Sequence, residues 1–317
     1  MTTQVRATGR DRRHGPDRRL SAVEDTEFPA ETPGVGQPRP QSLVLAFFGN
    51  HVLDEGGRCV YSGSIIDVLG RVGVGEQAVR STLTRMVGRG LLRRQRQGRR
   101  MYFGLTGQAE RILHDGSRRI WHDGAVNEDW DGVWTLLGFS LPDSWQRQRH
   151  DLRSRLIWYG FGALYSGLWI APGRVDVSGV IAELGLADRV KVFHASADEA
   201  TTDVERMIRE SWDLAAIAAR YTAFDQRWTA LEATEGHLGD PVATRLLLVT
   251  EWLGVIRTDP RLPVRHLPPA WPARPAQETF RRIATRTHEP ARRLARELLD
   301  TVPEAPDDGT GARGTGA

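Results

Sequence analysis

The chain has 317 residues, of which 40% are apolar and 26% charged, the composition of a soluble globular protein long enough for two or three domains. This composition excludes collagen-like, disulfide-framework and wholly disordered chains. The single cysteine, Cys59, allows neither an intrachain disulfide nor a thiolate metal cage, so we expect a protein of the reducing cytoplasm without a bound metal.

Both ends of the chain, residues 1–40 and 301–317, are predicted to be disordered tails. The first is rich in arginine, proline and glycine and has no continuous apolar segment, so it does not resemble a secretory signal. The longest uncharged run extends from Leu156 to Gly173, but five glycine or proline residues interrupt its 18 positions. No membrane span is therefore expected.

Charge is distributed unevenly along the chain. The stretch from Glu76 to Trp121 contains 11 arginines and three acidic residues, a net charge of +8, whereas the remainder carries −5. A basic island in an otherwise acidic protein is typical of a surface that meets a polyanion. A solvated arginine-rich surface would give the same count, so the charge alone leaves both interpretations open.

Three helices are predicted around the start of this island. The apolar stretch from Ser42 to Gly49 forms the first. The second runs from Ser64 to Val72 and opens with Ser64 three residues before Asp67, which is a capping-box pattern. After a glycine-rich turn, the third helix runs from Glu76 to Arg89 and ends at a glycine.

The third helix has one apolar and one polar face. Its apolar positions are Val79, Leu83, Met86 and Val87. Its polar face carries the candidate base-contacting residues Gln77, Arg80, Ser81, Thr84 and Arg85. Arginine can bind guanine through two hydrogen bonds, glutamine can pair with adenine, and hydroxyl groups can reach phosphate or a thymine methyl group. Each of these side chains could equally be a solvated residue of a helix surface.

A basic hairpin is predicted next, with arms from Leu91 to Gln97 and from Arg99 to Leu105 joined at Gly98. Its tip carries Arg94, Arg96, Arg99 and Arg100. We expect these arginines to neutralise phosphates without reading sequence. Helix, helix, tight turn, polar-faced helix and basic hairpin together predict a winged helix-turn-helix DNA-binding domain over residues 41–122.

Three stretches of this region match a known family: Ser42 to Asn50, Gly75 to Leu92 and Gly98 to Thr106. They resemble the PaaX family of bacterial transcriptional repressors, which control phenylacetic acid catabolism. The resemblance extends to about Leu299. Further matching motifs are the run GFGALYSGLWIAP and the segments Asp259 to Pro263 and Leu267 to Pro272.

The resemblance implies a homodimer that binds double-stranded operator DNA and leaves it when it binds an aryl-CoA thioester, phenylacetyl-CoA in the best-known members. No resident cofactor is expected, and the target would be an operon for aromatic-acid catabolism. A family member with another pathway and another effector remains an alternative. The arginine- and proline-rich tail before Gln41 departs from the compact start of the family.

The central residues, 130–198, are predicted to form a ferredoxin-like domain in the order strand, helix, strand, strand, helix, strand. The strands are Trp134 to Ser140, Gly162 to Ser166, Leu168 to Ala171 and Val190 to Ala195, and the helices are Gln146 to Trp158 and Val177 to Leu184. The resemblance extends to small nucleases of CRISPR adaptation, which need paired acidic residues where the first strand ends. Here Ser140 is at that position, with Asp143 beyond it, so we expect dimer contacts instead of a nuclease.

Residues 202–300 are predicted to be a helical domain, which makes the whole chain a multidomain α+β protein. The expected helices are Asp203 to Leu231, Val242 to Ile256 and Ala276 to Leu299, with a proline-rich linker from Asp259 to Pro275.

An aryl-CoA effector needs cations for its phosphates and an apolar slot for its ring. The candidate cations are Arg147, Arg149, Arg153, Arg155 and Arg174, and the candidate slot residues are Trp158, Trp169, Trp212 and Trp252. The alternative is that the arginines form a solvated helix face and the tryptophans fill domain cores.

Enzymatic signatures are absent from the sequence, which contains no His-Glu-x-x-His, Gly-x-Ser-x-Gly or Walker-type motif. His266 is expected to be a packed loop residue and Cys59 an inert buried thiol. A nucleic-acid enzyme built on the central domain, or a CoA-thioester enzyme with an accessory DNA-binding domain, would each need a catalytic cluster that the sequence lacks. The chain is therefore predicted to be a regulator and not an enzyme.

Overall fold

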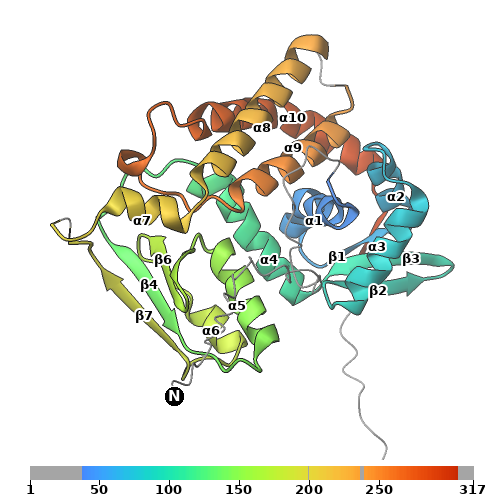
Figure 1. Ribbon diagram of the computed structural model, residues 1–317. Coiled ribbons are helices and arrows are strands. Elements are labelled where there is room, and N and C mark those ends of the chain that lie inside the picture. Colours follow the sequence, from blue (N-terminus) through green and yellow to red (C-terminus); the bar gives the residue numbers. More distant parts are fainter. Residues whose placement is uncertain (1–37, 199, 236–238, 306–317) are drawn as a thin grey trace, which may run out of the picture. The chain divides into compact units, whose positions relative to one another are not determined.

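The computed structural model describes residues 38–198, 200–235 and 239–305, and these form a mixed α+β structure with two four-stranded sheets (Figure 1). The predicted α+β class is thereby confirmed. Residues 1–37 and 306–317, which make up most of the two predicted tails, lie outside the described residues. No helix in the described part of the chain is long and apolar enough to cross a membrane.

The first sheet is built mainly from the N-terminal part of the described chain. Its strands follow the order β2-β3-β1-β8, and every neighbouring pair is antiparallel. The elements up to the hairpin are α1 (Pro40–His51), η1 (Leu53–Glu55), β1 (Arg58–Tyr61), α2 (Ser62–Gly70), α3 (Glu76–Gly88), β2 (Leu92–Gln97) and β3 (Arg100–Leu105). Helices α1 and α2 both pack against α3, and their shared core includes Phe47, Phe48, Ile65, Leu69 and Leu83.

The fourth strand of this sheet, β8 (Thr301–Pro303), comes from the far end of the described chain. It pairs antiparallel with β1, with Cys59 opposite Val302. This corrects the prediction of a disordered tail from residue 301, because β1 would otherwise be an edge strand with unpaired backbone groups. Three residues are too few to show a strand pattern in the sequence.

The predicted capping box of α2 is wrong. The helix begins at Ser62, two residues before Ser64, and the residue that precedes it is Tyr61. Ser64 is buried inside the first turn, and its hydroxyl oxygen accepts a hydrogen bond from the backbone N–H of Asp300 at 3.1 Å. A serine that satisfies a distant backbone group has the same spacing to Asp67 as a cap, so the sequence pattern cannot separate the two roles.

The second sheet contains the central strands in the order β5-β6-β4-β7, all antiparallel. Its elements are β4 (Trp134–Phe139), α5 (Gln146–Trp158), β5 (Gly162–Tyr165), β6 (Leu168–Pro172), α6 (Ser178–Glu183) and β7 (Val190–Ala195). Helices α5 and α6 cover one face of this sheet (Figure 1). The core between these helices and the sheet includes Leu137, Leu152, Leu156, Phe161 and Trp169.

Helices dominate the remaining described residues. They are α4 (Gly107–Arg118) with the π-helical turn η2 (Arg119–Asp123), then α7 (Val204–Ser211), α8 (Leu214–Glu235), α9 (Pro241–Ile256), η3 (Val264–His266) and α10 (Ala273–Leu298). Helix α10 packs against both α8 and α9. At the centre of this packing the rings of Trp252 and Phe280 stack with their centroids 4.8 Å apart.

The single helix predicted from Asp203 to Leu231 is divided in two. Trp212 has an extended backbone that ends α7, and the Asp213 carboxylate accepts a hydrogen bond from the N–H of Ala216 at 2.9 Å, which caps the start of α8. An apolar pattern continues through this break because Trp212 is itself buried. Hydrophobic periodicity alone therefore could not reveal it.

The linker before α10 is attached to the helices by a buried carboxylate. Asp259 accepts hydrogen bonds from the hydroxyl of Tyr221 and, at 2.7 Å, from the backbone N–H of Arg261. Burial raises the pKa of Asp259, and burial together with this carboxylate raises the pKa of Tyr221 well above its ordinary value. The segment from Asp259 to Pro263 thus has a structural role inside the helical part.

Candidate nucleic-acid interface

Helix α3 presents all five candidate base-contacting side chains to solvent. Gln77, Arg80, Ser81, Thr84 and Arg85 are exposed, whereas Val79, Leu83 and Met86 on the opposite side are buried. This separation of faces follows the predicted 3.6-residue period. Gly75 precedes the helix with an extended backbone, and Gly90 after it has φ of +70°.

Local contacts orient the polar side chains of α3. The Arg80 guanidinium lies 2.7 Å from the Glu76 carboxylate, one turn earlier on the exposed face. The Thr84 hydroxyl donates to the backbone carbonyl of Arg80 at 2.9 Å, and Arg85 donates to the hydroxyl of Thr82 at 3.2 Å. Arg80 and Arg85 are thus both held along the helix surface and remain open to solvent.

The hairpin of β2 and β3 carries its arginines on an exposed tip. Arg94, Arg96 and Arg99 are exposed, and the turn between the strands is made by Gly98 with φ of +59°. Arg96 donates to the carbonyl of Gly98 at 3.0 Å. Neither Arg94 nor Arg99 is paired with a carboxylate of residues 38–198, 200–235 or 239–305. These side chains leave a concentrated positive charge facing solvent.

Arg100 differs from the other hairpin arginines because it is paired with the C-terminal segment. Its guanidinium lies 2.5 Å from the carboxylate of Asp300 and 5.1 Å from the ring centroid of Tyr61. The Tyr102 hydroxyl also donates to Asp300 at 3.3 Å. The hydrogen bonds that Arg100 makes with Tyr102 and Asp300 raise the pKa of its guanidinium.

A second arginine of this sheet is also neutralised by the C-terminal segment. Arg93 forms an ion pair with Glu304, and Gln95 bonds the carbonyl of Pro303 at 3.2 Å and the N–H of Ala305 at 2.9 Å. Asp300 and Glu304 were not among the predicted site residues. The two acidic residues flank the three-residue strand β8. In the sequence this spacing does not indicate which strand β8 pairs with.

The arginines predicted to bind an effector point to different neighbours. Arg149 donates to the carbonyl of Leu141 at 2.8 Å and so closes the loop after β4. Arg147 lies 3.9 Å from Asp151 and Arg174 lies 3.7 Å from Asp131, both as surface ion pairs. Arg153 is exposed. These four side chains do not converge on one anion-binding position.

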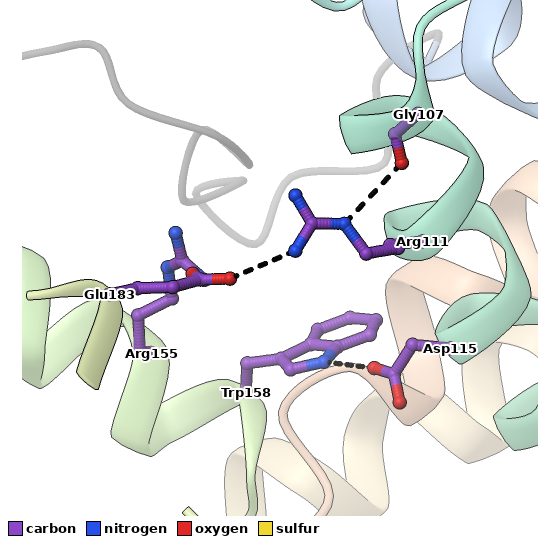
Figure 2. Close-up of polar contacts among 6 residues, drawn as sticks. All are labelled: Gly107, Arg111, Asp115, Arg155, Trp158 and Glu183. Carbon is purple, nitrogen blue, oxygen red and sulfur yellow. Dashed lines mark hydrogen bonds and ion pairs between the residues drawn. The ribbon is translucent and has the colours of Figure 1, made fainter. Parts of the chain in front are cut away.

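Arg155 and Trp158, two more effector candidates, belong to a polar junction between α4 and the central helices (Figure 2). Glu183 of α6 accepts from Arg155 at 3.2 Å and from Arg111 of α4 at 3.3 Å. The indole N–H of Trp158 donates to the carboxylate of Asp115 at 2.6 Å. Figure 2 shows both guanidinium groups directed at the same carboxylate. The structure therefore gives these two residues a linking role.

The remaining tryptophan candidates are divided between separate cores. Trp169 is buried in the core of the second sheet, and Trp252 is buried beside Phe280 in the helical part. Trp212 stacks on Trp134 with ring centroids 6.4 Å apart. The nine predicted effector residues thus do not line one common site.

Cys59 and His266 have the packed environments that the sequence predicts. The Cys59 thiol is buried, and burial raises its pKa, so the reactive thiolate is disfavoured. The His266 ring lies 5.3 Å from that of Trp130 and 6.2 Å from that of Trp134. Within the described residues no three His, Cys, Asp or Glu side chains are grouped as a metal site.

Related nucleases hold their paired acidic residues at the end of the strand that corresponds to β4, and the described residues at this position are arranged differently. Strand β4 ends at Phe139, and Asp143 in the following loop lies 3.5 Å from Arg149. The Asp143 side chain is fully exposed to solvent.

Comparison with known proteins identifies the family of this chain. Residues 39–109 match a profile described as PaaX-like protein, residues 127–207 match the PaaX protein central Cas2-like domain, and residues 212–297 match the PaaX-like protein C-terminal domain. The chain is 30% identical over 281 residues to the transcriptional repressor PaaX of Escherichia coli K12, with 85% of this chain and 87% of the relative covered. This chain belongs to the PaaX family.

One solved structure supports the fold of this PaaX-family protein. It is the uncharacterized protein Rv0674 from Mycobacterium tuberculosis, which is 21% identical and superimposes with a TM-score of 0.50. The match covers 82% of this chain and all of the other. The family assignment places this PaaX-family protein among transcriptional regulators and not among enzymes.

Proposed function

We propose that this protein is a transcriptional repressor that binds operator DNA through a winged helix-turn-helix. In this proposal residues 41–122 are the DNA-binding domain, α3 enters the major groove, and the β2–β3 hairpin grips the backbone. The observation that carries it is the exposed polar face of α3 beside a hairpin whose Arg94 and Arg99 pair with no carboxylate of the described residues. The repressor function of the Escherichia coli relative supports it.

The central residues 130–198 would then be a ferredoxin-like domain that holds two copies together, with the helical domain at residues 202–300. The strand order β5-β6-β4-β7 and its antiparallel pairing support this interpretation. Edge strand β7 also exposes Phe193, whose side chain is 58% accessible, at a position where a second copy could cover it. A dimer presents two α3 helices and therefore recognises an inverted repeat.

We further propose that the operator controls an aromatic-acid catabolic operon and that an aryl-CoA thioester such as phenylacetyl-CoA releases the repressor. The family assignment supports this effector class. The expected result is release by phenylacetyl-CoA in a mobility-shift assay, with the free acid leaving the complex intact. Release by micromolar phenylacetate would contradict the thioester requirement.

Replacing Arg80 with alanine tests base reading by α3. Each bidentate contact to a base discriminates by about 1 to 3 kcal/mol, so Arg80→Ala should relax selection at one position of each half-site. Binding-site selection with randomised operators measures this change. The half-site centres should be about 10 base pairs apart, or a multiple of that.

The matched control for Arg80→Ala is Glu76→Gln, which removes the carboxylate that holds Arg80 without removing the guanidinium. It should keep the same preferred base. A footprint over a single half-site, formed by monomers, would refute the mode of binding.

Replacing Asp300 with asparagine tests the pairing of the hairpin with β8. Because the Asp300 carboxylate forms an ion pair with the Arg100 guanidinium, Asp300→Asn should free one cation per subunit to contact phosphate. The slope of log affinity against log salt should then become steeper by about 0.9 for each new contact, or about 1.8 for a dimer. Glu297→Gln, on the exposed side of α10, removes the same charge outside the sheet and should leave the slope unchanged. An unchanged slope in Asp300→Asn would show that Arg100 does not reach DNA.

A further inference from the structure

A cavity of about 780 Å³ lies where α7 meets α8, opposite the loop before α10. One wall is the junction from Arg209 to Leu214 with Ala215 and Ala218 of α8, and the other is the segment from Pro268 to Pro272. This second wall belongs to the motif from Leu267 to Pro272, for which the DNA-binding proposal has no use. Its volume is within the range of pockets that hold small ligands.

The walls of this cavity are mainly apolar and include two indole rings. Trp212 and Trp271 come from opposite walls, and three prolines, three alanines and Leu214 make up the rest of the apolar lining. Flat aromatic faces and proline rings suit a planar aromatic group. The smaller cavity of about 320 Å³ beside Arg174 has no tryptophan in its lining.

Two polar groups of this junction are buried without a hydrogen-bond partner among the described residues. The indole N–H of Trp212, a residue only 8% exposed, and the hydroxyl of Ser211 are buried without a hydrogen-bond partner in the described part of the chain. A buried donor left unpaired destabilises the folded state. Such unsatisfied groups are rare in folded proteins, and each marks a constrained or functional segment.

One cation of the lining is also available. Arg209 is exposed and forms no ion pair with the carboxylates that the structure describes, while its neighbour Glu210 is engaged by Arg206 at 2.8 Å. The other lining acid, Asp213, is used as the cap of α8. Positive charge at the mouth of an apolar cavity favours a ligand with an anionic group outside its aromatic end.

The loop that forms the second wall has a fixed and strained shape. Ala270 has φ of +59°, a conformation that is unfavourable for a residue with a Cβ, and prolines at 268, 269 and 272 restrict the backbone on both sides. Strain of this kind persists where the surrounding structure imposes it, and it is concentrated at ligand-binding segments. The wall is thus preformed.

We propose that this cavity binds the aryl-acyl end of the effector, with Trp212 and Trp271 against the ring and Arg209 attracting the CoA phosphates. This inference rests on the proposed function, because it assigns a place to the effector of that repressor. The position also has a route to the DNA-binding sheet. Helix α10 begins at Ala273, directly after the loop, and continues into β8, whose flanking Asp300 holds Arg100 of the hairpin.

Filling the cavity tests this assignment in the full-length protein. Ala218→Trp places an indole in the lining, whereas Ala219→Trp adds the same side chain to the next, exposed position of α8 outside the lining. Isothermal titration with phenylacetyl-CoA should show at least tenfold weaker binding to Ala218→Trp than to the wild type or Ala219→Trp. Operator affinity without ligand should be equal in all three.

A second variant keeps the test decisive if Ala218→Trp fails to fold. Arg209→Gln changes an exposed side chain, and it should weaken phenylacetyl-CoA several-fold while leaving phenylacetyl-pantetheine, which lacks the nucleotide phosphates, unaffected. Undiminished binding of phenylacetyl-CoA to both variants would overturn the cavity assignment and leave the effector-released repressor standing. A wild type that binds no phenylacetyl-CoA would overturn both.

Discussion

Raising the salt concentration from 50 to 200 mM is expected to weaken operator binding by roughly a thousandfold. Three exposed hairpin arginines, Arg94, Arg96 and Arg99, would contact phosphates on each subunit, which gives about six contacts in a dimer. Each contact releases condensed counterions, and the logarithm of affinity falls by about 0.9 per contact for each tenfold rise in salt. Arg100 is not included in this count because it forms an ion pair with Asp300.

The double variant Arg94→Ala/Arg99→Ala removes about four of these contacts in a dimer. It should weaken binding to every DNA sequence alike and reduce the salt slope to about two. Fluorescence anisotropy with operator and random duplexes at several salt concentrations measures both effects. Arg147→Ala provides the control, since this side chain is 86% exposed on α5 and lies outside the hairpin. A slope that the double variant leaves unchanged would remove the hairpin from the interface.

Acidification from pH 6.5 to 4 is expected to lower the free energy of unfolding by about 3 kcal/mol through one histidine, His51. This residue ends α1, which packs against α9, and its Nε2 is buried without a hydrogen-bond partner among the described residues. Burial, with a smaller contribution from the charge of Arg245, lowers the pKa of His51 from 6.5 to about 4.

The sign of this effect follows from the lowered pKa. Between pH 6.5 and 4 the unfolded chain binds a proton at His51 that the folded chain excludes, so acid favours the unfolded state. The contribution is complete above pH 6.5 and is lost as the pH falls toward 4. Since α1 belongs to the proposed DNA-binding domain, loss of its contact with α9 should also release that domain from the helical part.

Urea denaturation at pH 7 and pH 4.5 measures the difference, and His51→Gln should make it smaller by about 2 to 3 kcal/mol. Any destabilisation by the new side chain cancels because each protein is compared with itself at two pH values. His288→Gln changes a histidine that is 54% exposed on α10 and should keep the acid sensitivity of the wild type. Equal pH dependence in His51→Gln and wild type would show that His51 is not protonated on unfolding.

Two helices were predicted well from local sequence. The bounds of α5, Gln146–Trp158, agree with the prediction, and α3 ends one residue earlier than predicted. The exposed face of α3 followed from its hydrophobic period, because apolar residues at helical spacing must be buried on one side. Both results follow from local sequence, and so does the prediction that the candidate base-contacting residues are exposed.

Features that depend on distant contacts could not be predicted. Asp300 and Arg100 are 200 residues apart, and neither has a local pattern that identifies the other. The break at Trp212 is set by a cap at Asp213 within a continuous apolar stretch. Likewise the indole of Trp158 is hydrogen-bonded to Asp115, whereas the sequence left both a ligand slot and a domain core open for this residue. Tertiary packing decides the role of such residues.

The order of the first sheet, β2-β3-β1-β8, also determines when this surface can form during synthesis. A ribosome adds about 5 to 20 residues per second, so the 200 residues between Arg100 and Asp300 require roughly 10 to 40 seconds. During that interval β1 is an edge strand whose free backbone groups can pair with another nascent chain. A polypeptide terminated before Thr301 keeps this open edge, so prematurely released fragments should aggregate instead of competing with intact repressor for its operator.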